Sequence, residues 1–146
     1  MKQLTIRLTL PITIISMFLI TKWWFALPID GPDKLYWGFP FPFLGQGFHT
    51  SMSFQFFILE FVADFIIYFL AWVCLFLIIT KRFSITRVSK SLIKTVWTMA
   101  LLLSVGFVLL VSTSNPVYLL KRDYDWKILQ TGHVFIWQDT PWPDRD

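Results

Sequence analysis

The hydrophobic positions of the chain gather into three runs, each about as long as a membrane-spanning helix. The runs cover residues 8–27, 54–80 and 95–114, and more polar segments connect them. About 20 apolar residues in a helix cross the roughly 30 Å of hydrocarbon in a bilayer, and a backbone in lipid must satisfy its hydrogen bonds within the segment. The pattern therefore predicts an all-α, three-helix integral membrane protein that forms a single membrane domain over residues 1–146.

The composition points to the same surroundings. The chain is 55% hydrophobic and 15% charged, whereas a soluble domain carries about 25% charged residues. The net charge of +4 would suit a nucleic-acid-binding protein. The basic residues instead cluster at the ends of the apolar runs, so we expect a lipid bilayer and not nucleic acid as the partner. The single cysteine, Cys74, lies inside the second run, which excludes an intramolecular disulfide.

The first run could also be a secretory signal peptide. Lys2 and Arg7 form a basic start before the apolar stretch, as such a signal requires. No small-x-small cleavage site follows, because Trp23, Trp24 and Phe25 occupy the place where it should be. We therefore expect an uncleaved signal anchor, with a cleaved signal as the alternative.

The connections between the runs alternate in charge. The N-terminal tail has two bases and no acid, residues 28–53 have one base and two acids, residues 81–94 have five bases and no acid, and residues 115–146 have four bases and five acids. Basic segments stay on the cytoplasmic side of a membrane. The charge pattern predicts a cytoplasmic N-terminus, a cytoplasmic loop at 81–94 and an outside C-terminus, in a bacterial inner membrane.

The two outside segments differ in composition. Residues 28–53 are rich in Pro, Gly and aromatic residues, which oppose regular structure and need cover from water. We expect this segment to lie on the outer membrane interface or to bind a partner subunit through Tyr36, Trp37, Phe39, Phe41 and Phe43. In residues 115–146, β-forming residues flank Thr131 and Gly132, so this part could form a short β-hairpin.

Two carboxylates interrupt the second apolar run. Glu60 and Asp64 are four residues apart, so they share one helical face with Tyr68, and that face should turn away from lipid. Lys22, near the outer end of the first run, should lie level with Glu60 and could pair with it, while Tyr68 could donate to Asp64. Three roles for the acids stay open: pairing within the chain, pairing with another subunit, and transport of protons or cations.

Sequence motifs for a reaction are missing from the chain. It has no phosphate-binding glycine loop, no nucleophile elbow, no metal-ligand spacing, and no histidine within a span to hold haem. We therefore expect no catalytic residue, metal or cofactor, and predict a non-catalytic accessory or assembly subunit of a larger membrane protein complex. The alternative is a proton- or cation-linked subunit of a transporter or energy-transducing machine that uses Glu60 and Asp64. A weaker third hypothesis is a small lipid-acting membrane enzyme that uses His49 and the acids.

Overall fold

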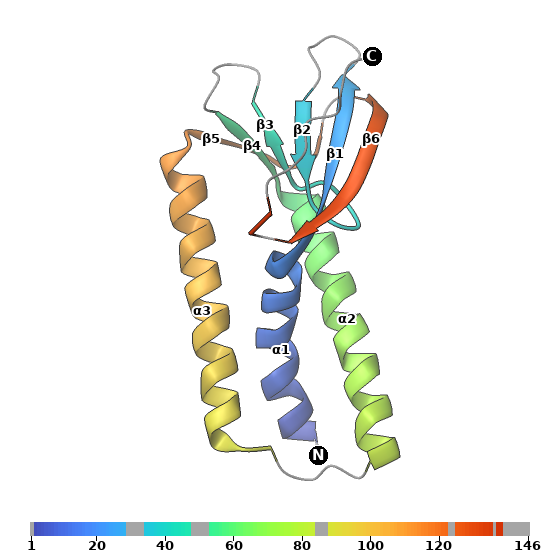
Figure 1. Ribbon diagram of the computed structural model, residues 1–146, viewed down its shortest axis with the longest axis vertical. Helices are drawn as coiled ribbons and strands as arrows, with labels where there is room; N and C mark the ends of the chain where they lie inside the picture. Colours follow the sequence, from blue (N-terminus) through green and yellow to red (C-terminus); the bar gives the residue numbers. More distant parts are fainter. Residues whose placement is uncertain are drawn as a thin grey trace.

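Three helices stand side by side, and a six-stranded sheet covers one end of them (Figure 1). The computed structural model of the chain describes residues 2–28, 34–47, 53–83, 88–122, 125–135 and 137–138. The helices are α1 (Lys2–Leu19), α2 (Ile58–Phe83) and α3 (Lys90–Thr113). The strands are β1 (Ile20–Pro28), β2 (Lys34–Trp37), β3 (Leu44–Gln46), β4 (Phe54–Phe57), β5 (Pro116–Leu119) and β6 (Trp126–Phe135).

The chain is a mixed α/β protein, so the prediction of an all-α, three-helix membrane protein is wrong. The first apolar run leaves the helix at Leu19 and continues as β1, and the first four residues of the second run form β4. Among the described residues, two helical stretches are long and apolar enough to cross a membrane, by length and composition only: Ile58–Arg82 and Lys90–Thr113. The apolar part of α1, Arg7–Leu19, is shorter.

The sequence predicted a helix up to residue 27, where the structure has strand β1, and this error has a physical cause. The strands bury apolar side chains on both faces of the sheet, so β1 shows no alternation of polar and apolar residues. One core cluster contains Trp23, Phe25, Leu35 and Val134, and the other contains Ala26, Tyr36 and Phe57. A strand that is buried on both faces has the same continuous apolar sequence as a helix in lipid, and periodicity cannot separate the two.

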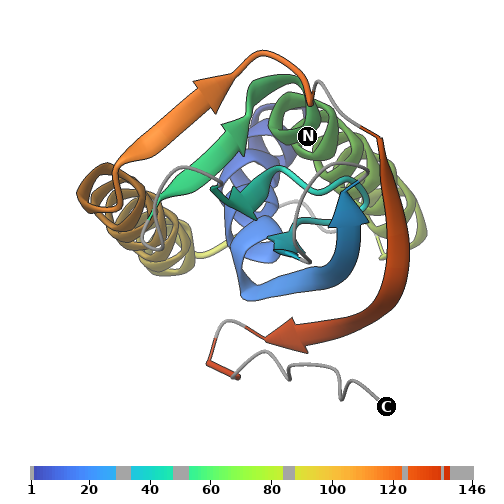
Figure 2. The ribbon, with the colours of Figure 1, turned by 90° about the horizontal axis from the view of Figure 1, so that it is seen from above.

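The sheet is strongly curved and has the order β5-β4-β3-β2-β1-β6 (Figure 2). Strands β4 and β5 run parallel, and the other neighbours run antiparallel. The expected hairpin around Thr131 and Gly132 is wrong, because both residues lie inside the single strand β6. This strand pairs with β1 along its whole length, from Ile20 opposite Phe135 to Pro28 opposite Trp126.

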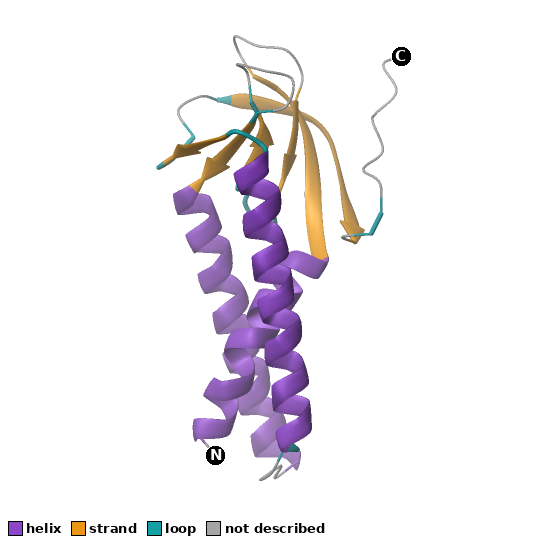
Figure 3. Ribbon diagram, turned by 90° about the vertical axis from the view of Figure 1, so that its left-hand side faces the viewer, coloured by secondary structure: helices purple, strands orange, loops and turns teal. Residues whose placement is uncertain are grey.

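The helices show apolar side chains on their outer surfaces. Helix α1 packs against both α2 and α3, which lie on either side of it (Figures 1 and 2). All three helices lie below the strands (Figure 3). Only 6% of the most apolar window of α2 and 11% of that of α3 are buried. Large apolar side chains are exposed along both helices, including Leu70 and Ile78 of α2 and Leu102 and Leu109 of α3. These two helices are therefore not the buried core helices of a compact soluble domain.

Candidate functional site

Asp64 connects α2 to the loop between β2 and β3. We call this loop, residues 38–43 with the sequence GFPFPF, the aromatic loop. The Asp64 side chain is completely buried, and its Oδ1 accepts a hydrogen bond from the backbone N–H of Phe41 at 2.9 Å. Its Oδ2 is buried without a hydrogen-bond partner. The Asp64 carboxyl group is thus the acceptor for a backbone N–H of the loop, and this bond holds the loop against the second turn of α2.

The sheet fixes both ends of the aromatic loop. The N–H of Gly38 donates to the carbonyl of Lys22, and the indole Nε1 of Trp24 donates to the carbonyl of Gly38, each at 2.9 Å. Gly38 has φ of +146°, and a Cβ there would collide with the Phe41 carbonyl oxygen, so only glycine fits. At the other end, Phe57 donates its N–H to the carbonyl of Phe43 at 2.8 Å. The loop is therefore a defined structure and not a free connection.

Glu60 holds a second segment on the same helix. Its Oε1 accepts a long hydrogen bond of 3.5 Å from the N–H of Arg122, in the stretch that follows β5. Its Oε2 is buried without a partner. The N–H of Leu59 donates to the carbonyl of Leu120 at 3.0 Å and strengthens this attachment. The two acids thus bind two segments that are far apart in the sequence to the first turns of α2.

The other two residues of the predicted pairing group have different contacts. Lys22 lies on β1, not on a helix, and its Nζ is 3.9 Å from the centroid of the Trp24 ring, a cation–π contact. Within the described part of the chain, no ion pair joins Lys22 to Glu60, and no hydrogen bond joins Tyr68 to Asp64. Tyr68 is half-buried, one helical turn beyond Asp64. The partners of the acids are therefore backbone amides.

The five aromatic partner-binding candidates differ in how far the structure exposes them. Tyr36 and Phe43 are buried in the chain, and Trp37 packs against one core cluster. Phe39 and Phe41, both on the aromatic loop, stay 38% and 46% exposed. The ring of Phe39 meets the ring of His133 edge-on at 5.2 Å between centroids. Phe39 and Phe41 are thus the two candidates that a partner or a lipid surface can reach.

A polar contact between α1 and α2 was not predicted. The Nε1 of Trp72 donates to Ser16 Oγ at 2.9 Å, and Ser16 Oγ donates to the carbonyl of Thr13 at 3.1 Å. Trp72 lies four residues after Tyr68, so the stripe of Glu60, Asp64 and Tyr68 continues directly to it. Extending the stripe by one helical turn would have found this residue.

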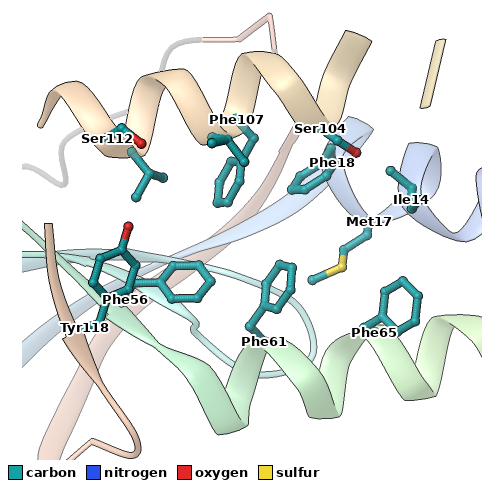
Figure 4. A pocket seen from close by; sticks show the side chains of 12 residues that line it. Ile14, Met17, Phe18, Phe56, Phe61, Phe65, Ser104, Phe107, Ser112 and Tyr118 are labelled. Carbon is teal, nitrogen blue, oxygen red and sulfur yellow. The ribbon is translucent and has the colours of Figure 1, made fainter. Parts of the chain in front are cut away.

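An apolar groove lies between α2 and α3, with α1 as its floor (Figure 4). Its volume is about 380 Å³, and its lining includes six large apolar side chains: Met17, Phe18, Phe56, Phe61, Phe65 and Phe107. Ser104 and Ser112 of α3 and Tyr118 of β5 also line it. The Phe18 and Phe107 rings, 4.8 Å apart, join α1 to α3 within this groove. Neither Glu60 nor Asp64 lines it, so the acids and the groove are separate features.

The two histidines of the chain, His49 and His133, are the remaining candidates from the sequence. His49 lies outside the described residues, and His133 is exposed on β6. Within the ranges that the structure describes, no group of three or more His, Cys, Asp or Glu side chains could hold a metal ion. Comparison of the chain with protein-family models, with curated proteins and with solved structures finds no match.

Proposed function

We propose that this chain is a membrane-embedded, non-catalytic accessory subunit that presents the aromatic loop to a partner membrane protein. The observation that carries the proposal is the attachment of this loop by a buried carboxylate, Asp64, while Phe39 and Phe41 stay exposed. Ordering a loop in advance removes an entropic cost of binding. Aromatic residues are enriched at the centres of protein interfaces, where a few side chains supply most of the binding energy.

Membrane insertion of α2 and α3 supports this proposal. Both helices have the length and apolar composition to cross a bilayer, and neither is covered by its own chain. Lys81 and Arg82 at the end of α2 and Lys90 at the start of α3 lie at the end of the bundle far from the sheet (Figure 1). With basic residues on the cytoplasmic side, the sheet and the aromatic loop are outside, in a bacterial inner membrane.

Single cysteines test this orientation in a Cys74→Ser background. Lys127→Cys on exposed β6 should react with a membrane-impermeant maleimide added to intact cells or spheroplasts. Lys94→Cys near the start of exposed α3 should react only after the membrane is opened. The opposite labelling pattern would reverse the orientation, and equal labelling of both positions before opening would contradict insertion.

The partner role is tested by a double variant, Phe39→Ala with Phe41→Ala. Both side chains are exposed, so the fold should persist while a stoichiometric complex in mild detergent is lost. Trp137→Ala is the matched control, because Trp137 is an aromatic residue that is 68% exposed on the sheet side. Native mass spectrometry of the purified complex gives the readout. Retention of the complex by the double variant, or equal loss with Trp137→Ala, would remove the aromatic loop as the binding element.

A second candidate function is a proton- or cation-linked subunit. The observation in its favour is that Asp64 Oδ2 and Glu60 Oε2 are both buried without a partner. Intramembrane acids commonly mark ion pathways. The substitutions Asp64→Asn and Glu60→Gln keep the accepting oxygens that bind Phe41 and Arg122. Loss of a proton- or cation-dependent activity, with the complex intact, would favour this candidate over the accessory role.

A further inference from the structure

Strand β6 forms one edge of the sheet, and within the part of the chain that the structure describes no strand pairs with its outer side. Most of its residues are exposed. The opposite edge, β5, has four residues against the ten of β6, and it begins with Pro116, which has no N–H to donate. An edge strand presents a row of backbone N–H and C=O groups to which a further strand can bind. Of the two edges, β6 has the longer row.

The hydrogen bonds of β1 identify residues of β6 whose backbone groups point outward. Paired residues of an antiparallel ladder alternate between those that exchange hydrogen bonds and those that do not. Lys22, opposite His133, uses its carbonyl to accept from the N–H of Gly38, on the other side of β1. Lys22 and His133 are therefore a pair without mutual hydrogen bonds, and the N–H and C=O of His133 point away from β1. By the same alternation, so do those of Thr131, two residues earlier and opposite Trp24.

The end of β6 agrees with this alternation. Phe135, two residues after His133, donates its N–H to Gln138 Oε1 at 3.0 Å, and its carbonyl accepts from the Gln138 N–H at 2.9 Å. The outward groups of Phe135 are thus occupied. Among the described residues, the backbone groups of Thr131 and His133 have no such partner. Together these two residues present two donors and two acceptors, with the spacing of alternate residues along a strand.

The sequence of this part of β6 does not oppose the addition of a strand. Proteins commonly protect an exposed edge with Pro, Lys or other charged residues. Residues 130–134, with the sequence QTGHV, contain none of these. The ladder between β1 and β6 has a bulge at Phe25 and Ala26, where Leu129 is left without a partner. The free edge therefore covers residues 130–134, with the bulge before it and the contacts of Gln138 after it.

The free edge adjoins the aromatic loop. The rings of Phe39 and His133 meet edge-on at 5.2 Å between centroids, and both residues are exposed. In a bound strand, the side chain opposite His133 would lie on the same face of the sheet and would reach Phe39. Strand addition obtains affinity from main-chain hydrogen bonds and specificity from the side chains that alternate along the strand. The edge and the aromatic loop together offer both.

We propose that the partner membrane protein adds an extended segment to the β6 edge at Thr131 and His133, beside Phe39. The inference rests on the proposed function and deepens it by naming the way in which the partner binds. The four outward backbone groups of these two residues would bond to the main chain of the segment. The segment lies outside the membrane, on the side of the sheet.

A second copy of this chain does not fit the same edge in a symmetric dimer. Two identical edges pair symmetrically only when their strands run antiparallel, and β6 runs from the far end of the sheet toward the helices (Figures 1 and 3). Antiparallel pairing would therefore place the helices of the two copies at opposite ends of the dimer. Two copies inserted in one membrane with the same orientation cannot do this.

Hydrogen exchange at single amides tests the proposal on the unaltered chain. The chain alone in mild detergent is compared with the stoichiometric complex purified in the same detergent, and mass spectrometry with fragmentation resolves the amides. In the free chain, Thr131 and His133 should exchange fast, whereas Gly132 and Val134, whose N–H groups point toward β1, should exchange slowly. In the complex, exchange at Thr131 and His133 should be at least about tenfold slower, because the bound strand must first leave.

A matched pair of variants separates the backbone from the side chain. Thr131→Pro removes the outward N–H and, at an edge position of this kind, leaves the ladder with β1 in place. Thr131→Ala removes the side chain and keeps the N–H. Thr131→Pro should weaken binding of the purified partner roughly tenfold, since one hydrogen bond is lost and the ring lies where the strand would be. Thr131→Ala should bind as the unaltered chain does, and slow exchange at Gly132 in free Thr131→Pro would show that its sheet is intact.

The outcomes separate this inference from the proposed function. A complex in which Thr131 and His133 still exchange fast, or equal binding by Thr131→Pro and Thr131→Ala, would overturn the inference and leave the accessory role in place. Slow exchange at both amides in the free chain would mean that the C-terminal residues or a second copy cover the edge, which native mass spectrometry distinguishes by mass. That result would also overturn the inference. If no stoichiometric complex forms, the proposed function fails and the inference fails with it.

Discussion

Apolar side chains are buried in the centre of the sheet, whereas apolar side chains of the helices are exposed. In the sheet, Tyr36 and Phe57 are completely buried, and apolar clusters cover both faces of the strands. In the helices, Ile78 and Leu102 are 65% and 66% exposed. The comparison teaches that hydrophobic content alone does not say what covers a residue. The centre of the sheet is covered by its own chain, whereas the outer faces of α2 and α3 are not.

The largest expected effect of this difference concerns the reactivity of Cys74 in α2. It is exposed near the middle of α2, so in water its thiol would react freely. If lipid covers α2, reaction with an impermeant maleimide in vesicles should be roughly tenfold or more slower than after unfolding in SDS, because a water-soluble reagent does not reach a thiol that is covered by hydrocarbon. Lys127→Cys, in a Cys74→Ser background, is the exposed control on the sheet. Equal rates at the two positions in vesicles would show that water, not lipid, covers the helix.

Asp64 of α2 binds the aromatic loop between β2 and β3. Replacing it should therefore weaken the attachment of the sheet to the helices. Asp64→Leu removes the acceptor of the Phe41 N–H, and an orphaned buried donor costs about 1–3 kcal/mol. Asp64→Asn keeps an oxygen in that position and should cost less. The free energy of unfolding in detergent and the rate of proteolysis within the aromatic loop measure the effect. If Leu and Asn variants lose the same amount, the hydrogen bond to the loop is not what makes Asp64 important.

Two glycines compare packing in the sheet and on a helix directly. A Cβ at Gly45 of β3 would collide with the buried Tyr36 ring, so Gly45→Ala should lower the free energy of unfolding by about 1–3 kcal/mol. At Gly106 of α3 a Cβ meets nothing within 4 Å, and Gly106→Ala should raise it by up to about 1 kcal/mol through helix propensity. Denaturation of both variants under the same conditions gives the two values. Equal effects would contradict the difference in packing.

The same difference explains what the sequence could and could not predict. The second and third apolar runs, 54–80 and 95–114, correspond within a few residues to α2 and α3, because a long exposed apolar helix has an unmistakable pattern. Strand β1 was missed because burial on both faces removes its alternation.

The candidate site was predictable to a similar extent. Spacing alone placed Glu60 and Asp64 on one helical face. Their partners could not be found in this way, because the N–H groups of Phe41 and Arg122 are backbone atoms that every non-proline residue carries. The pairing of Lys22 with Glu60 failed as an expectation for a different reason. It assumed that the first helix continued past Leu19, whereas Lys22 lies on β1 and contacts Trp24.

The smallest predicted effect belongs to the hydrogen bond between α1 and α2. A double-mutant cycle with Trp72→Phe and Ser16→Ala isolates it from the bond that Ser16 makes to Thr13. Side-chain hydrogen bonds between helices in membranes have coupling energies of about 0.6 kcal/mol on average. We expect a coupling energy of this size when the unfolding free energies of the four proteins are measured in detergent. The value is small because the polar groups find other hydrogen-bond partners when this bond is absent. The control cycle combines Trp72→Phe with Thr95→Ala, whose hydroxyl bonds only within α3, and should give no coupling. A zero coupling for Trp72 and Ser16 would mean that α1 and α2 are held together by apolar packing alone.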